Sequence, residues 1–232
     1  PGGGEAFWRS DTFNTTNSVH AAYLVSSYNK VGFDEAGSRF ATATLNYAAP
    51  SDGSCVTATE RTNCQAAAEA ADSSLNFAAY DHIEYWMPHE FTCSWSGVAI
   101  SCANVIGTSP NLGGSRPAGS CWSMTRATST GTLSEKRDTR IHEIGHNMGV
   151  SHATGYEAEY GDPTDVMGVG EVNTFSAAVR WQMGWLAHTQ PTIADGATSV
   201  YNIRELAVDP STASDGYHSI VAIRCPECLA PG

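Results

Sequence analysis

Three histidines, a glutamate and a glycine lie between residues 142 and 152 at the spacing H-E-x-x-H-x-x-G-x-x-H. Residues four apart share one face of a helix, so His142 and His146 can together bind one metal ion, and imidazole nitrogen is an ordinary ligand of Zn²⁺. Glu143 points about 100° away around the helix, which suits a base that reaches a metal-activated water rather than the metal itself. These residue types at this spacing predict hydrolytic chemistry.

A third ligand requires the helix to end soon after His146. In a continuous helix, His152 would lie about 240° around the axis from the other two histidines. Gly149 is positioned for the reversal, because glycine adopts the left-handed conformation that ends helices. We therefore predict His142, His146 and His152 as ligands of one zinc ion, with Gly149 in the helix-ending turn. The alternative is a surface helix that carries histidines, and five fixed positions match by chance at about 10⁻⁷ per starting position.

The stretch resembles the signature of the metzincin zinc endopeptidases, which includes a downstream methionine turn. Residues 165–168 (D-V-M-G) are similar to that turn, and the resemblance implies that Met167 lies beneath the zinc. The wider run 159–168, followed by 175–177 (F-S-A) and 180–186 (R-W-Q-M-G-W-L), resembles more particularly the gametolysin family of algal cell-wall-degrading proteases.

The resemblance to gametolysin implies a protein or glycoprotein substrate from a cell wall or matrix, and an inhibitory pro-segment that keeps the enzyme latent. Astacin-like and serralysin-like relatives carry a tyrosine two residues after the turn methionine. This chain has Val169 there, so the sequence does not support a tyrosine ligand at that position.

The pattern of the whole chain predicts an α+β fold. Strong helix formers within 59–77 predict a first helix. The active helix is expected to run from a capping box at Thr132 and Glu135 to about Met148. An apolar stripe predicts a further helix over 174–186. Strands are expected over 19–28, 40–47, 80–87, 198–208 and 217–224. The resemblance to the metzincins further implies a twisted mixed sheet with the active-site helix over a smaller, mainly helical and irregular lower part.

Length and composition predict one compact domain with an appendage. Residues 1–190 are expected to form the catalytic domain, with an upper part to about 149 and a lower part over about 150–190. Residues 191–232 are expected to form a C-terminal β segment, which either packs on this domain or begins a further β module.

An exposed strand edge is a second candidate element of the site, because a peptide can complete its unpaired N–H and C=O groups as an added strand. Metzincins have such a strand at the upper edge of the cleft. Residues 98–106 are its candidate in this chain, with Val98 and Ile100 as substrate contacts. The surrounding stretch 93–121 is rich in Cys, Gly, Ser and Pro, so a disulfide-bonded surface loop is the alternative.

The net charge of the chain is −12, from 24 acidic and 12 basic residues. This excess argues against nucleic acid or an anionic membrane as a partner, because both attract basic surfaces. No apolar run reaches the roughly 18 residues of a membrane span. Some of the carboxylates could also hold Ca²⁺, although the spacing of an EF-hand loop does not occur.

Seven cysteines in a chain of this size indicate an oxidising, extracellular setting. We expect Cys55 to pair with Cys64, because the two flank a short polar turn. Cys93, Cys102 and Cys121 are expected to contribute one bridge near the cleft edge, while one of the three pairs elsewhere. Because seven is odd, at least one thiol is free or pairs outside this chain.

Two functions fit these residues. The first is a secreted zinc endopeptidase that hydrolyses extracellular proteins. Zinc held by three neutral imidazoles would keep a position open for water and lower the pKa of that water toward about 7. Glu143 would carry the proton from this water to the leaving amine. The second is a catalytically silent matrix or adhesion protein stabilised by zinc. Glu143 favours the enzyme, because a structural zinc site closes its fourth position and needs no base.

Overall fold

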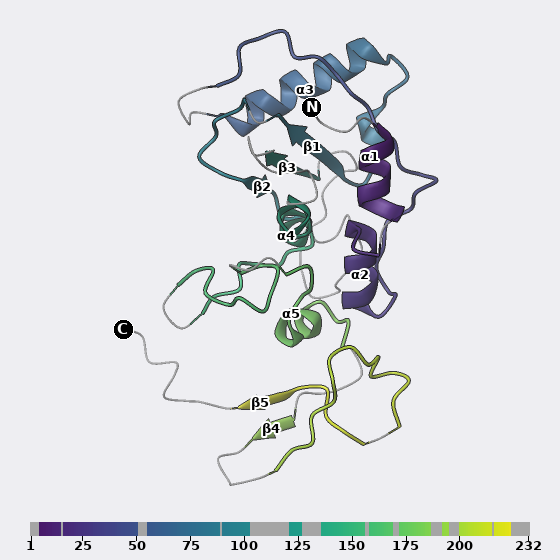
Figure 1. Ribbon diagram of the computed structural model, residues 1–232, viewed down its shortest axis with the longest axis vertical. Helices are drawn as coiled ribbons and strands as arrows, with labels where there is room; N and C mark the ends of the chain where they lie inside the picture. The colour runs from purple at the N-terminus through teal and green to yellow at the C-terminus, as the bar shows by residue number, and fades with distance from the viewer. Residues whose placement is uncertain are drawn as a thin grey trace.

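A three-stranded sheet lies between two helices, α3 (Thr57–Ala71) and α4 (Arg137–Asn147), in the computed structural model of the chain (Figure 1). Helix α5 (Ala177–Gln182) follows beyond α4, and a two-stranded β piece lies at the far end. The structure describes residues 5–14, 16–50, 55–88, 90–102, 121–126, 136–155, 158–168, 172–186, 192–194, 200–214 and 216–223. This arrangement is the predicted α+β fold.

The remaining elements are, in chain order, α1 (Glu5–Arg9), the π-helical turn η1 (Ser10–Asn14), α2 (Val19–Ser27), the 3₁₀ turn η2 (Phe77–Ala79), β1 (Ile83–Met87), β2 (Gly97–Ala99), β3 (Trp122–Arg126), β4 (Thr192–Ala194) and β5 (Val221–Ile223). Within the described ranges, no helix has both the length and the apolar character needed to cross a membrane.

The upper sheet is mixed, as predicted, with the strand order β1-β3-β2. Strand β3 pairs in parallel with β1 and antiparallel with β2. Ile83, Tyr85 and Met87 of β1 are buried while the residues between them are half-buried, which is the alternation that predicts a strand over 80–87. The helix predicted over 59–77 corresponds to α3, which ends earlier, at Ala71.

The strands predicted over 19–28 and 40–47 are wrong. The buried residues of α2 are Val19, Ala22, Tyr23, Ser26 and Ser27. Their spacing of three and four is that of a helical face, and two of the five are serines, which a search for apolar alternation overlooks. Ser18 caps this helix by accepting a hydrogen bond from the amide of Ala21. Residues 40–47 form no strand and pair with none of the described strands.

Two predicted helices have different bounds in the structure. The active helix α4 begins at Arg137, whereas the predicted cap residues Thr132 and Glu135 lie outside the described residues. The helix predicted over 174–186 shortens to α5, which ends at Gln182. It begins only at Ala177, because Ser176 accepts a hydrogen bond from the amide of Val179 and caps the first turn.

Helix α4 is fixed from two sides. The buried side chain of Tyr23 on α2 donates its hydroxyl to the carbonyl oxygen of Ile141 at 2.8 Å. At the other end of α4, the amide of the Asn147 side chain donates to the carbonyl oxygens of Ile100 at 2.6 Å and Trp122 at 2.8 Å. The helix that carries the motif is therefore bonded both to α2 and to the upper sheet.

Apolar side chains form two buried clusters on opposite sides of this arrangement. The upper cluster packs around the sheet and contains Ile83, Tyr85, Met87, Phe91, Cys93, Trp122 and Met124. The lower cluster contains Val19, Ala22, Tyr23, Ile141, Ile144, Met148, Val150, Val166, Met167, Phe175, Val179, Met183 and Trp185. One side of α4 thus packs against the lower cluster, and its other side packs against the sheet.

The C-terminal β piece differs from its prediction. Strands β4 and β5 pair in parallel, and β5 occupies only part of the predicted strand 217–224. The described part of the other predicted strand, 198–208, contains a single bridge from Ile203 to His218. The division of the chain near residue 190 stays a prediction.

Two disulfide bonds connect the described cysteines, Cys55 with Cys93 and Cys102 with Cys121. The predicted pairing of Cys55 with Cys64 is wrong, because Cys64 lies inside α3 with a free, half-buried thiol whose pKa burial raises to about 11. The bridge between Cys102 and Cys121 is the one expected near the cleft edge.

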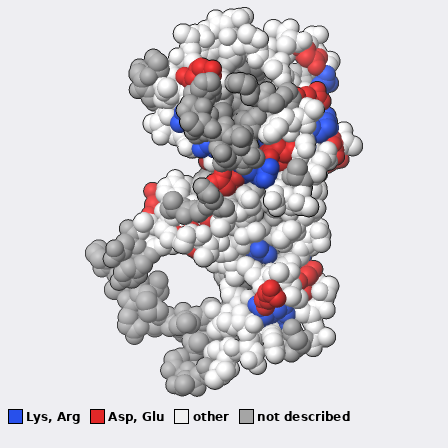
Figure 2. Space-filling model, viewed as in Figure 1, with Lys and Arg blue, Asp and Glu red and all other residues white. Residues whose placement is uncertain are grey.

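Charged side chains of both signs are mixed on the surface. Figure 2 shows acidic and basic residues next to one another at several places on the viewed face. Among the described residues, Arg9 forms ion pairs with Glu5 at 3.1 Å and with Glu35 at 3.7 Å. On this face the acidic excess of the described residues is not gathered in one patch.

Candidate metal centre

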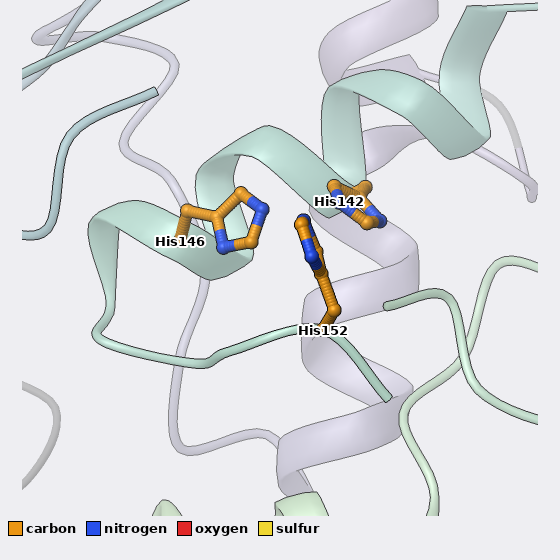
Figure 3. A group of neighbouring side chains, drawn as sticks. All are labelled: His142, His146 and His152. Carbon is orange, nitrogen blue, oxygen red and sulfur yellow. The ribbon is translucent and has the colours of Figure 1, made fainter. Parts of the chain in front are cut away.

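The three histidines of the motif point toward one another. His142 and His146 project from α4, and His152 reaches them from the segment that follows the helix (Figure 3). One ligand nitrogen from each ring lies within 4.8 Å of those from the other two. Zinc–nitrogen bonds of about 2.0–2.1 Å bring ligand nitrogens closer to one another than this limit, so the rings would draw together around a bound ion. The predicted ligands are therefore brought together.

A tight turn brings His152 back to the helix. The amide of Gly149 donates to the carbonyl oxygen of His146 at 2.9 Å, and the amide of Val150 donates to that of Gly145 at 3.1 Å. This pair of hydrogen bonds is the Schellman motif, which needs a left-handed residue after the helix. Gly149 has a φ of 87°, as its place in the motif predicts.

Each imidazole is oriented by a hydrogen bond from its Nδ1. The acceptors are the carbonyl oxygen of Val166 for His142, the carbonyl oxygen of Val150 for His146, and the Glu159 carboxylate for His152, at 2.8, 2.8 and 2.7 Å. A carbonyl oxygen or carboxylate can only accept, so Nδ1 carries the proton and Nε2 keeps its lone pair. Three rings fixed in this tautomer present three Nε2 atoms as ligands.

Two of the histidines are also kept neutral by their surroundings. Burial, together with the neighbouring His146 and His152, lowers the pKa of His142 to about 4, although its hydrogen bond to Val166 acts in the opposite direction. Burial likewise lowers the pKa of His146. Because metal ligation requires neutral imidazole, the donor set fits a divalent metal ion at neutral pH.

Glu143 lies beside the three histidines in a nearly dry environment. The residue is only 5% exposed, and its Oε2 atom has no hydrogen-bond partner among the described residues. Burial raises the pKa of its carboxyl group to about 8. An unpaired buried carboxylate is costly, so this one is positioned to bind a proton or to face a cation.

The three histidines and Glu143 line a cavity of about 670 Å³. Its lining comprises Gly97, Val98, Ala99, Ser101, His142, Glu143, His146, Gly149, Val150, Ser151, His152, Thr154, Glu159 and Tyr160. Strand β2 therefore forms one wall of the cavity, and Val98 is part of its lining, whereas the role of Val98 as a substrate contact stays a prediction. Ile100 is not part of this lining, and its half-buried side chain packs against the upper apolar cluster.

The methionine turn lies directly below α4. Met167 is fully buried, and a Cβ atom on Gly145 would lie 2.6 Å from its sulfur, so the missing side chain of Gly145 makes room for it. The amide of Met167 donates to the Asp165 carboxylate at 2.8 Å, and its carbonyl oxygen accepts from the amide of Ala153 at 2.8 Å. The turn is thus bonded to itself and to the segment that carries the third histidine.

A buried ion cluster precedes the motif. The guanidinium of Arg140, two residues before the first histidine, pairs with Glu84 of β1 at 2.6 and 2.7 Å and with Asp11 of η1. The rings of Trp8 and Trp86 lie 5.4 and 5.2 Å from this guanidinium. The N-terminal segment is therefore joined to the beginning of the active helix.

Three residues of the site were not found by reasoning from the sequence: Gly97, Glu159 and Tyr160. The Tyr160 ring lies 3.9 Å from that of His152, and partial burial, then Glu159 and Glu143, raise the pKa of its phenol. Gly97 and Tyr160 lie outside the motif in the sequence, and only the folding of the chain brings them to the cavity that the motif lines. The resemblance of the run 159–168 to the gametolysin family implies no role for Glu159 or Tyr160.

Residues 5–224, nearly the whole chain, match the model of the gametolysin peptidase M11 family. The fold and the histidine site thus belong to a metallopeptidase. More particularly, the chain is a member of the gametolysin peptidase M11 family. Comparisons with curated proteins and with solved structures gave no significant match.

Proposed function

We propose that the protein is a secreted zinc-dependent endopeptidase that acts on extracellular proteins, with cell-wall or matrix glycoproteins as the candidate substrates. The observation that carries this proposal is the convergence of three imidazoles, each with its Nδ1 engaged, beside a buried glutamate that has an unpartnered oxygen. His142, His146 and His152 would hold the metal. Zinc with an open position lowers the pKa of water and polarises a carbonyl group.

Glu143 moves the proton in this proposal. It takes a proton from the attacking water, whose oxygen forms a bond to the scissile carbonyl carbon. When the C–N bond breaks, Glu143 gives this proton to the leaving nitrogen, so that one water and one peptide bond become an acid and an amine. A carboxyl group whose pKa is raised by burial is suited to both the acceptance and the return of a proton.

Strand β2 supplies the binding surface for an extended peptide. It pairs with β3 on one side only among the described strands, and Gly97, Val98 and Ala99 line the cavity. A substrate that adds to the free edge would satisfy the backbone groups of this strand and lie across the histidines. Two disulfides support an oxidising, extracellular location.

The test uses zinc-loaded protein freed of any pro-segment and a library of peptides. Elemental analysis should give one zinc per chain, and His152→Ala should lose most of it. Glu143→Gln should keep the zinc and the fold while peptide hydrolysis falls by about 10²-fold or more. Glu69→Gln, at an exposed position of α3, is the matched control and should retain full activity.

A catalytically silent, zinc-stabilised matrix protein is the alternative to this proposal. It is favoured if the zinc-loaded wild type cleaves no peptide at neutral pH. If Glu143→Gln is as active as wild type, the proposed proton transfer is wrong even where the metal content is right. Mass spectrometry of the library products would also define the cleavage preference.

A further inference from the structure

The segment after His152 folds back over that residue. The amides of Gly155 and Gly161 each donate to the carbonyl oxygen of Ala158 at 3.0 Å, and the amide of Asp162 donates to that of Ala153 at 3.2 Å. The backbones of the two glycines are so close that a Cβ atom on Gly161 would lie 2.6 Å from the Cα of Gly155. This contact holds residues 158–162 in place and directs two consecutive side chains toward the metal centre.

The first of these side chains, Glu159, accepts the hydrogen bond from His152. The second, Tyr160, places its ring 3.9 Å from the His152 ring and 6.0 Å from the His142 ring, nearly parallel to the latter at 25°. Tyr160 is 39% exposed and lines the cavity that also contains Glu143. Its hydroxyl has no hydrogen-bond partner within the part of the chain that the structure describes. A polar group without a partner is thus available at the edge of the site.

We propose that Tyr160 is a catalytic residue, whose hydroxyl donates a hydrogen bond to the carbonyl oxygen of the scissile peptide as negative charge develops on it. This proposal rests on the proposed peptidase function. A phenol has an ordinary pKa of about 10 and is therefore a protonated donor at neutral pH. Donors aimed at a developing oxyanion are worth about 10²–10³-fold in kcat, because they bind the transition state more strongly than the ground state.

A purely structural role would use the ring alone. In that case Tyr160 covers His152 and limits its movement, and the hydroxyl makes no difference. Tyr160→Phe separates the two roles, because it keeps the ring and removes only the O–H group. Tyr201→Phe is the matched control, since Tyr201 also lies beside a histidine ring, 5.6 Å from that of His218, but outside the cavity.

The experiment compares wild type, Tyr160→Phe and Tyr201→Phe, each loaded with zinc. For Tyr160→Phe we expect kcat to fall by about 10²-fold while KM changes by less than about 3-fold and zinc content stays at one per chain. A second readout is the dissociation constant of a phosphinic peptide, whose tetrahedral oxyanion resembles the transition state, measured by calorimetry. It should rise by a factor similar to the loss in kcat for Tyr160→Phe and stay unchanged for Tyr201→Phe.

The outcomes distinguish this proposal from the function on which it rests. If wild type cleaves peptides and Tyr160→Phe does so equally well, the role of Tyr160 is overturned and the peptidase function stands. Loss of zinc from Tyr160→Phe would also overturn it, because the hydroxyl would then act on the metal site and not on the substrate. A zinc-loaded wild type that cleaves nothing would overturn both proposals.

Discussion

Gly97 and Glu143 occupy adjoining space: a Cβ atom on Gly97 would lie 2.6 Å from Cγ and 2.7 Å from Cδ of Glu143. The candidate base is therefore in the volume that a side chain on β2 would need. Because the carboxyl group is the end of a flexible side chain, a substitution would displace the base more readily than it would break the strand.

We accordingly expect Gly97→Ala to lower kcat/KM by about 10²-fold, close to the loss of the base itself, with little change in zinc content or in the urea midpoint. A double-mutant cycle with Glu143→Gln tests the cause. The double variant should be no slower than Glu143→Gln alone, because both changes remove the same function. Additive losses would show that Gly97 acts through the substrate and not through Glu143.

The carboxylate of Glu159 should determine how tightly the third histidine binds metal. It accepts the Nδ1 hydrogen bond of His152 at 2.7 Å, and partners of this kind are worth about 10–100-fold in metal affinity. Glu159→Ala should weaken zinc binding by that factor, measured by competition with a chromophoric chelator. The exposed Glu205→Ala is the control and should bind zinc as wild type does. An unchanged affinity for Glu159→Ala would mean that solvent replaces the carboxylate without loss.

The metal-free protein should lose stability as the pH rises above neutrality. Burial raises the pKa of Glu143 from 4.5 to about 8 and lowers that of His142 from 6.5 to about 4. Between pH 4.5 and 6.5 the two effects oppose each other, because the native state keeps a proton on Glu143 and lacks one on His142. Above pH 6.5 only Glu143 contributes. Its folded form stays protonated while the unfolded form is ionised, so stability falls by about 2 kcal/mol up to pH 8.

Urea unfolding in the presence of a chelator, at pH 6.5 and at pH 8, measures this difference. Glu143→Gln cannot ionise and should show a much smaller fall over the same interval. An equal fall in wild type and variant would assign the pH dependence to other groups.

The buried ion cluster around Arg140 should contribute strongly to stability. Asp11→Ala leaves the buried guanidinium with one of its two carboxylate partners, which typically costs about 3–5 kcal/mol. Glu5→Ala, which removes one of the two exposed partners of Arg9 in the N-terminal part of the chain, should cost less than about 1 kcal/mol. Urea denaturation of the two variants provides the comparison, and equal losses would contradict the importance of burial.

The convergence of the three histidines was predictable because these residues lie close together in the sequence. Helix geometry relates His142 to His146, and one glycine is sufficient to return His152. Gly97 and Tyr160 were not predictable in this way, since their roles depend on where β2 and the segment after Gly155 lie relative to α4. Glycine and tyrosine are common, and nothing near them in the sequence marks a role in the site.

The errors in the predicted fold have similar physical causes. Residues 19–27 look like a strand until the buried Ser26 and Ser27 are counted with the apolar residues of one helical face. The pairing of Cys55 with Cys64 assumed that nearness in sequence means nearness in space. In the structure the Cys64 thiol points from α3 to the sulfur of Met87 at 3.8 Å, and Cys93 is the residue whose Cα lies 5.1 Å from that of Cys55.

The helix-ending turn at Gly149 also bears on how the protein would depend on metal supply. All three histidines come from eleven residues, and their rings are already oriented by bonds that do not involve a metal. An ion bound there would close only a short loop. Cross-linking of the chain by the ion would therefore remove little conformational entropy from the unfolded state and contribute little to the stability of the fold. Metal would therefore be lost and regained by an already folded chain. Zinc scarcity should then reduce the active fraction of the enzyme without reducing the amount of folded protein.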